Sequence, residues 1–501
     1  MLPRVRAALP LAAIVVLGAA LRFYGLGFGL PHPQARPDET VAVGHADAIM
    51  HGHLHPHFFN WPTLVLYVFG AALTVARAAG VVLTRTREFV IARSVSALAG
   101  TATIPVLAAL AGRIADRPTA LASALFMAVA TLPVRESHFA VTDTVMTLLV
   151  TTSLALMTRA VDTRRTRDVA LAGAAGGLAT SAKYSAAAIL AVVLAAPGVG
   201  AAAAFVATWA IAFVAGSPFI AIDPRAFLAD FAYERAHLGG GHTVSLARGW
   251  IQHLVVTLPA GTGWAMCAAA AAGLALAAWR GNRRLLVPAL FAVGFYVSIG
   301  AGRTVFFRYA LPLVPMVCLA AAIAATAAGR AVALRARIPA SVAIAAIALA
   351  IAVPSLAQSA RLDRLLARTD SRVVAETWLA GQLTPQDTLY DSGGNYSRLW
   401  FDSLEFHEWR YDAAARSFHD PEGRTPGWIV LHESPLPEYT DPPESIRTLV
   451  RERYALVHRV DGVPAQAGGA VYDRQDAFFL PIAGFSGIER PGPTVLIYRL
   501  R

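Results

Sequence analysis

The chain has 501 residues, of which 56% are hydrophobic and 15% are charged, and its mean hydropathy is +0.52. This composition excludes an ordinary soluble domain and predicts a polytopic membrane protein. The formal charge of +11 could suit nucleic-acid binding, but much of the arginine lies in short loops between apolar runs, where it sets membrane topology instead. Cys267 and Cys318 both lie inside apolar runs, so we expect neither a disulfide framework nor a cysteine-bound metal.

The first apolar run covers about residues 8–28 and is preceded by Arg4 and Arg6. About 20 helical residues at ~1.5 Å each are enough to cross a bilayer. A cleaved signal peptide is an alternative, because small residues lie near the end of the run, but it does not account for the hydrophobic segments that follow. As an uncleaved helix with its positive residues inside, the run places residues 29 onward on the outer face.

Residues 29–62 form a polar stretch that is rich in His and Pro and carries the adjacent acidic residues Asp38 and Glu39. Charges are costly in hydrocarbon, so carboxylates kept beside a membrane point to a function. The alternative is a solvated pair of loop charges. The alternating histidines from His51 to His57 would share one face only in an extended strand, and we favour packing or substrate hydrogen bonds over a metal site.

The apolar run at residues 62–83 is interpreted as a helix on the outer surface rather than as a second span. If this run crossed the membrane, the arginine-rich residues 159–168 would lie outside, against the positive-inside rule. Arg77 also suits the interface better than the middle of the membrane. The same reasoning predicts eleven spans, at about residues 8–28, 92–112, 118–134, 144–158, 169–183, 184–198, 201–219, 257–278, 285–301, 309–328 and 339–355.

Two domains are expected from this pattern. Residues 1–355 form a transmembrane catalytic module, whose outer loops are residues 29–91, with interfacial helices, and residues 220–256. Residues 356–501 are richer in polar residues and predict a soluble α/β domain on the extracytoplasmic side. The supporting patterns are one helix-like stretch and two β-type runs, at residues 371–382, 428–432 and 494–500.

Three acidic residues, Asp38, Glu39 and Asp143, fall at the outer ends of helices on this topology. A carboxylate beside an apolar wall can act as a general base or hold a metal. Asp143 opens the fourth span, so its structural alternative is a helix N-cap. Two separate acidic sites on one membrane face favour a catalytic role over a solvated charge pair at Asp38 and Glu39 or a helix N-cap at Asp143.

Cations on the same face complete the pattern. Lys183, the only lysine in the sequence, ends the fifth span, and Arg303 and Arg308 flank the start of the tenth. Cations at the membrane boundary would bind the phosphate of a lipid carrier. The alternative is that each side chain extends to the lipid headgroups without binding a substrate.

Six short sequences occur in the order PDE, HPHFFNWPTLVLY, ARSVSALAGT, RESHFAVTD, GLATSAKYS and FRYALPLVP. Together they resemble bacterial members of the GT-C superfamily of membrane glycosyltransferases, and in particular the family 39-like enzymes, a group that includes protein O-mannosyltransferases and the lipid A aminoarabinose transferase. The resemblance covers roughly residues 8–355 and depends on the order of the motifs rather than on any one of them. Two further sequences, YDRQDAFFLPIAGF and RPGPTVLIYR, resemble the tail of bacterial members.

The resemblance implies roles for individual residues. Asp38 matches the catalytic acidic position, which is expected to act as a base on the acceptor, and Glu39 matches its partner. Asp143 matches a second acidic position beside the site of transfer. The expected donor-phosphate-binding residues are Lys183, Arg308 and Tyr309, with Arg303 added from proximity alone, and the candidate substrate-binding residues are His57, Asn60, His138 and Tyr184.

The implied reaction is an inverting transfer of a hexosyl or pentosyl group from a polyprenyl-phosphate donor, with the lipid phosphate leaving, in the inner or plasma membrane. No cofactor is assigned, and the need for a divalent cation is left open. The acceptor is a protein, lipid or polysaccharide, because the carbohydrate-binding insertion of the eukaryotic mannosyltransferases is not found in the sequence.

Two other functions are consistent with a chain of this kind. A flippase or transporter of lipid-linked saccharides would place its ionisable groups near the middle of the bilayer rather than at outer helix ends. A structural membrane protein that uses residues 356–501 as a binding module would tolerate the loss of Asp38.

Overall fold

The computed structural model describes residues 2–401, 406–420, 424–465 and 468–501. The chain divides into two compact units. The first unit comprises Met1–Tyr24 and Val41–Ala360, and the second comprises Gly25–Thr40 and Arg361–Arg501. The second unit therefore joins the C-terminal part of the chain to a short segment from near its start, a grouping that the sequence patterns did not predict.

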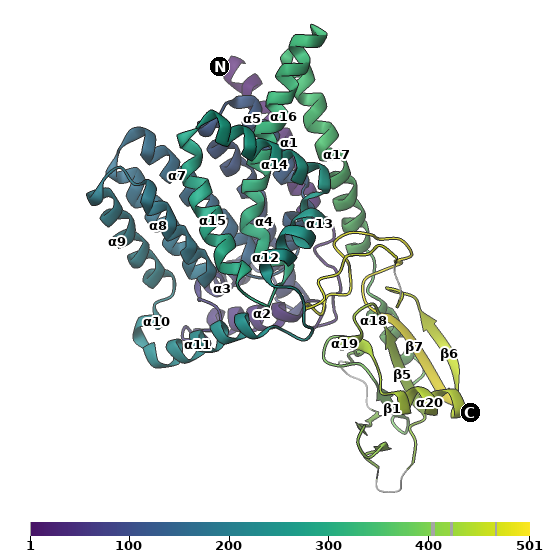
Figure 1. The fold of residues 1–501 in the computed structure, drawn as a ribbon. Helices are drawn as coiled ribbons and strands as arrows, with labels where there is room; N and C mark the ends of the chain where they lie inside the picture. Colours follow the sequence, from purple (N-terminus) through teal and green to yellow (C-terminus); the bar gives the residue numbers. More distant parts are fainter. Residues whose placement is uncertain (1, 402–405, 421–423, 466–467) are drawn as a thin grey trace. The chain divides into compact units, whose positions relative to one another are not determined.

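The first unit is built from helices (Figure 1). Its earlier helices are α1 (Leu2–Phe23), α2 (Pro37–Met50), α3 (Leu64–Ala78), α4 (Arg85–Ile114), α5 (Arg117–Val129), α6 (Thr131–Ser137), α7 (Asp143–Thr163), α8 (Thr166–Ala182) and the 3-10 helix η1 (Tyr184–Ala195). Its later helices are α9 (Val199–Gly216), α10 (Phe219–Ile222), α11 (Pro224–Gly240), α12 (Gly249–Ile251), the π-helix η2 (Gln252–Thr257), α13 (Leu258–Thr262), α14 (Trp264–Arg280), η3 (Arg283–Leu285), α15 (Leu286–Gly300), η4 (Phe307–Leu313), α16 (Val314–Ala336) and α17 (Ala340–Leu366). The first residues of α2 and the last residues of α17 belong to the second unit.

Many of these helices are apolar enough for a membrane. Among the described residues, five helices are long enough to cross one, or up to seven if each of two bent helix pairs counts as one span. The chain is thus a multi-pass membrane protein. The described residues contain fewer helices of spanning length than the eleven spans predicted. The predicted surface segment at residues 62–83 contains α3, whose 15 residues are shorter than the ~20 that a span needs.

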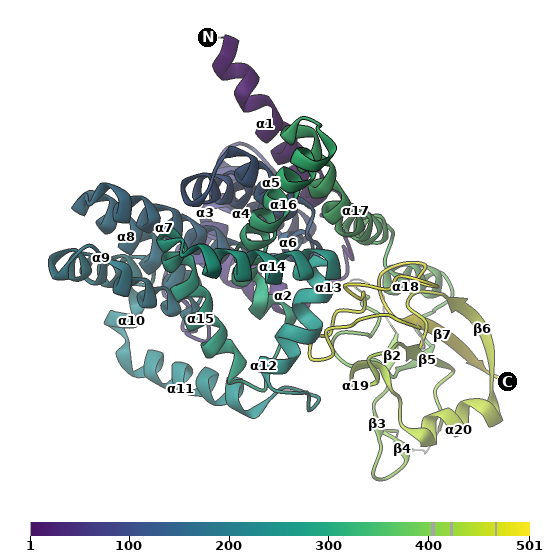
Figure 2. The ribbon, with the colours of Figure 1, turned by 45° about the horizontal axis from the view of Figure 1, so that its top comes forward.

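Helices α7, α8 and α9 lie side by side in the first unit (Figures 1 and 2). The contact between α8 and α9 depends on glycine. A Cβ atom added at Gly173 would lie 2.4 Å from the carbonyl oxygen of Phe205, and one at Gly177 would lie 2.1 Å from that of Trp209. Small residues let helix backbones approach closely in a membrane, where packing rather than the hydrophobic effect drives association. This packing fixes the end of α8, directly before Lys183.

A five-stranded sheet forms the centre of the second unit, in the order β2-β1-β5-β7-β6. Strand β1 pairs in parallel with β2 and β5, whereas β7 pairs antiparallel with β5 and β6, which flank it (Figure 1). A small antiparallel pair, β3 and β4, adds to the unit. The bounds are β1 (Thr388–Asp391), β2 (His407–Glu408), β3 (Tyr411–Asp412), β4 (Ser417–Phe418), β5 (Trp428–Glu433), β6 (Tyr454–Val460), β7 (Thr494–Leu500), α18 (Ser371–Ala380), α19 (Pro437–Thr440) and α20 (Glu444–Arg453).

Hydrophobic cores cover both faces of this sheet. Trp428 and Val430 of β5 pack with residues of α18, and the alternate residues Ile429 and Leu431 pack with residues of α20. A strand that is buried on both faces reads as a continuous apolar run, as WIVLH does. The predicted helix and both predicted strands of this region are confirmed by α18, β5 and β7.

Candidate active site

Lys183 and Asp143 form an ion pair in the first unit. Asp143 is the first residue of α7, and Lys183 follows the last residue of α8. The Nζ atom of Lys183 lies 2.7 Å from Oδ1 of Asp143, and the side chains are 17% and 1% exposed, respectively. A carboxylate buried to this extent needs a partner of opposite charge. The packing of α7 against α8 supplies that partner and leaves part of the lysine accessible.

The 3-10 helix η4 adds Arg308 and the Tyr309 ring to this pair, and the residue before η4 adds the Phe306 ring. The Nζ atom of Lys183 lies 4.6 Å from the centroid of the Tyr309 ring. The guanidinium carbon of Arg308 lies 4.1 Å from the Phe306 centroid and 5.8 Å from the Tyr309 centroid. Aromatic faces attract cations within about 6 Å. The Tyr309 ring therefore contacts both Lys183 and Arg308, the two cations predicted to bind phosphate.

A second cluster surrounds Tyr184, the residue after Lys183. The Tyr184 hydroxyl donates to the carbonyl oxygen of Phe59 at 2.8 Å, and the Phe59 amide donates to Asp230 Oδ2 at 2.8 Å. The side-chain amide of Asn60 donates to Glu234 Oε1 at 2.8 Å. Asp230 and Glu234 are four residues apart in α11, so they lie on one face of that helix. Of the predicted substrate-binding residues, Tyr184 and Asn60 are thus brought into one hydrogen-bonded group.

The remaining candidates of the first unit have other surroundings. His57 is exposed, and its ring stacks on His55 with centroids 3.8 Å apart. Arg303 has an exposed side chain, and its backbone amide donates to the carbonyl oxygen of Leu238 at 2.9 Å. His138 is fully buried, and its ring nitrogens each lie 2.9 Å from a backbone carbonyl oxygen. The environment of His138 is that of a histidine that supports the fold.

Asp38 and Glu39 belong to the second unit and lie in the first turn of α2. Carboxylates are favourable there because the helix dipole places partial positive charge at its N-terminus. Glu39 is fully buried and Asp38 is half-buried. Burial raises the pKa of the Tyr396 phenol, and the carboxylates of Asp38 and Asp476 raise it further against the opposing effect of Arg36. Tyr396 therefore lies within electrostatic range of Asp38.

Four residues of these clusters were missed by reasoning from the sequence. Asp230 and Glu234 could have been recognised from their helical spacing in the outer loop at residues 220–256. Arg36 and Asp476 form a buried ion pair within the second unit, and no local pattern connects residues 440 positions apart.

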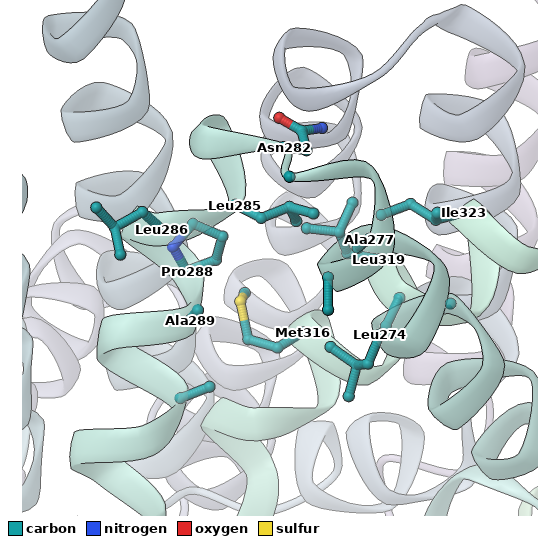
Figure 3. Close-up of a pocket in the computed structure, with 15 residues that line it drawn as sticks. Leu274, Ala277, Asn282, Leu285, Leu286, Pro288, Ala289, Met316, Leu319 and Ile323 are labelled. Atoms are coloured by element: carbon teal, nitrogen blue, oxygen red, sulfur yellow. The ribbon is translucent and has the colours of Figure 1, made fainter.

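An apolar cavity of about 460 Å³ opens between α14, α15 and α16 (Figure 3). Figure 3 shows Leu274, Met316 and Leu319 along its wall, with Asn282 at one end. None of the described residues that line it is ionisable, and none is a predicted site residue. The cavity offers a surface for hydrocarbon but no group that could carry out chemistry.

No group of three His, Cys, Asp or Glu side chains is arranged to hold a metal ion within the part of the chain that the structure describes. The cations of the first unit instead suit an anionic ligand. An arginine presents a planar fork of donors to phosphate oxygens, and a lysine acts as a point charge. Arg308 and Lys183 combine both kinds of group, and Asp143 orients the ammonium.

The fold is that of the GT-C membrane glycosyltransferases, as the resemblance in the sequence implied. Residues 63–222 match the profile of the family described as dolichyl-phosphate-mannose-protein mannosyltransferase. This range includes Asp143, Lys183 and Tyr184, whereas Asn60 lies just before it. Comparison with curated protein sequences finds no match.

Two solved structures illustrate the likeness. ArnT from Cupriavidus metallidurans bound to undecaprenyl phosphate is 16% identical, with a TM-score of 0.54 over 97% of this chain and 97% of that chain. The oligosaccharyltransferase AglB from Archaeoglobus fulgidus, in complex with an inhibitory peptide and a dolichol-phosphate, is 13% identical, with a TM-score of 0.52 over 76% of this chain. The present chain spans 58% of the length of that archaeal protein.

Proposed function

We propose that the protein is a membrane glycosyltransferase that moves a hexosyl or pentosyl group from a polyprenyl-phosphate donor to an acceptor. The cluster of Lys183, Asp143, Arg308 and Tyr309 is the observation that carries this proposal, because it offers two cations to a phosphate beside apolar helices. The lipid phosphates bound to ArnT and AglB are consistent with such a donor.

In the proposed reaction, an acceptor atom forms a bond to the anomeric carbon while the bond from that carbon to the phosphate oxygen breaks. Asp38 takes the proton of the acceptor, with Glu39 beside it, and Lys183 and Arg308 stabilise the charge of the departing phosphate. Asn60 and Tyr184 contact the substrate next to this site. Phosphate is a good leaving group, so the reaction needs little acid assistance.

The proposal includes the arrangement in the membrane. Eleven spans place the acidic and cationic residues on the extracytoplasmic side of the inner or plasma membrane, together with the C-terminal domain. Several of these spans would then be short or bent helices, such as η1 and the pair α5 and α6. Reaction of an introduced cysteine at an exposed position of the C-terminal domain with an impermeant reagent, applied to intact cells and to inverted vesicles, tests this orientation.

The test of activity is sugar transfer by purified protein from a panel of radiolabelled polyprenyl-phosphate hexoses and pentoses, with release of polyprenyl phosphate as the readout. Asp38→Asn and Lys183→Ala should abolish release. The matched controls are Asp47→Asn, later in the same helix α2, and Arg335→Ala, an exposed cation in the last turn of α16. Equal turnover by wild type, Asp38→Asn and Lys183→Ala would contradict the roles assigned to these residues, whereas transport of the intact lipid-linked sugar with no release by any variant would favour a flippase.

A further inference from the structure

The segment Gly25–Thr40 is packed as part of the C-terminal unit, although it precedes most of the helical unit in the chain. It connects α1 to α2 and contains both Asp38 and Glu39. Whatever fixes this segment therefore also fixes the two predicted catalytic carboxylates. The contacts that do so lie within the second unit.

The main contact is a buried ion pair directly before α2. Arg36 and Asp476 are 0% and 3% exposed, and a guanidinium nitrogen of Arg36 donates to the Asp476 carboxylate. The guanidinium carbon also lies 6.0 Å from the centroid of the Phe478 ring. Only Pro37 separates Arg36 from Asp38 in the sequence, so a movement of Arg36 moves the first turn of α2.

The loop that contains Asp476 is itself held in place. The Asp476 amide donates to the carbonyl oxygen of Asp473 at 3.0 Å, and the Tyr439 hydroxyl donates to the carbonyl oxygen of Gln475 at 3.0 Å. Phe478 packs edge-on against Phe28, with ring centroids 5.9 Å apart. The aspartate is therefore a fixed point of the C-terminal unit.

A second buried arginine fixes the preceding residues. Arg372 donates to Asp370 at 2.8 and 2.7 Å and to the carbonyl oxygen of Gln34 at 3.1 Å. The Nε2 atom of His32 lies 2.9 Å from the carbonyl oxygen of Arg398, and its Nδ1 atom accepts from the Gln34 amide at 3.1 Å. With the packing of Phe28 on Phe478, the segment is thus held at four points along its length, of which Arg36 is the nearest to Asp38.

We propose that Arg36 and Asp476 are positioning residues that set the place of Asp38 and Glu39, so that contacts within the second unit hold the proposed base and its partner. The inference that this affects turnover rests on the proposed function. A buried ion pair is a poor source of stability, because the loss of solvation offsets the attraction, but it has strict geometric requirements. A catalytic group displaced by about 1 Å can lose on the order of 100-fold in rate.

The experiment compares Asp476→Asn with Asp476→Glu, which keeps the charge, and with Tyr454→Phe. Tyr454 is a buried residue whose hydroxyl donates to the Pro426 carbonyl oxygen in the same unit, so its substitution controls for a general loss of stability. The readouts are hydrogen exchange of residues 25–40 by mass spectrometry, the melting temperature, and kcat and KM for the donor. The exchange measurement needs no activity, so it distinguishes failure of this proposal from failure of the proposed function.

We expect Asp476→Asn to increase exchange in residues 25–40 and to lower kcat by roughly 10- to 100-fold, with the donor KM within about threefold of wild type because the donor-binding cations are intact. Asp476→Glu should restore most of the rate. Tyr439→Phe, which removes a single hydrogen bond from the same loop, should act in the same direction with a smaller effect, and it remains usable if Asp476→Asn does not fold.

Three results would overturn the proposal. The first is unchanged hydrogen exchange in residues 25–40 of both Asp476→Asn and Tyr439→Phe, and the second is a kcat of Asp476→Asn equal to that of an active wild type. The third is a loss of kcat in Tyr454→Phe equal to that in Asp476→Asn when both variants lose the same melting temperature. If the wild type transfers no sugar, the proposed function fails, and the exchange data still decide whether Asp476 positions the segment.

Discussion

The ammonium group of Lys183 lies 2.7 Å from the carboxylate of Asp143, so the only lysine of the chain is paired with the first residue of α7. The two residues are 40 positions apart and are joined by the packing of α7 on α8. Because Asp143 is almost fully buried, the pair has a structural role in addition to the proposed binding of phosphate, and the two roles can be separated.

Lys183→Met should destabilise the protein by about 3 kcal/mol, because it leaves the Asp143 carboxylate buried without its cation. The double variant Asp143→Asn/Lys183→Met should recover most of that loss, since both charges are gone. Neither variant should bind polyprenyl phosphate as wild type does. Melting temperature and binding of a fluorescent polyprenyl phosphate check these outcomes, and recovery of binding in the double variant would contradict the role of Lys183.

Tyr309→Ala should weaken binding of polyprenyl phosphate by roughly 5- to 30-fold, because two cations lose the aromatic face that orients them and each such contact is worth about 0.5–1 kcal/mol or more. Tyr309→Phe keeps the ring and should bind within about twofold of wild type. The same binding assay decides this point. A large loss in Tyr309→Phe would show that the hydroxyl, rather than the ring, is the important group.

Gly177→Leu should destabilise the helical unit by more than about 2 kcal/mol, because its side chain would have to enter the space occupied by the Trp209 carbonyl group. Gly200→Ala in α9 is the control, since a Cβ atom there meets no neighbour within 4 Å. Thermal unfolding in detergent should show a lower midpoint for the first variant alone. Similar midpoints for both variants would mean that α8 and α9 can separate.

Acid should lower the stability of the second unit through protonation of His32. Burial, assisted by the charge of Arg372, lowers the pKa of His32 to about 3, and the unfolded chain has the ordinary value of 6.5. Between these values the unfolded state binds a proton that the folded state does not, so stability falls as pH drops below 6.5, by up to roughly 1.4 kcal/mol per pH unit. The loss ends near pH 3, where the folded state is also protonated.

The measurement for His32 is the melting temperature between pH 7.5 and 4.5. His32→Gln should have a shallower pH dependence than wild type, because the group that takes up the proton has been removed. His419→Gln, at an exposed position, should retain the wild-type dependence. Identical slopes for wild type and His32→Gln would exclude His32 as the responsible group.

The patterns in the sequence predicted those features that depend on nearby residues. Strands β5 and β7 and helix α18 are confirmed because their apolar periodicity is local. The GT-C fold was predictable because a series of motifs occurs in order along the chain, and the similar solved structures confirm it.

Features that depend on distant contacts were not predictable in the same way. The grouping of Gly25–Thr40 with the C-terminal unit arises from pairs such as Arg36 and Asp476, which nothing in either local sequence connects. The link from Tyr184 through Phe59 to Asp230 likewise joins three separate parts of the chain. The roles proposed for the site residues, including Asp38 and Lys183, stay predictions until they are measured.

The packing of Gly25–Thr40 with Arg361–Arg501 has a consequence for synthesis of the protein. A ribosome makes every residue of the proposed phosphate-binding cluster, up to Tyr309, before it makes Asp476. Until then, the segment with Asp38 and Glu39 has left the ribosome without the partners that hold it. The nascent chain can therefore contain all of its proposed phosphate-binding residues before the proposed base has the contacts that position it.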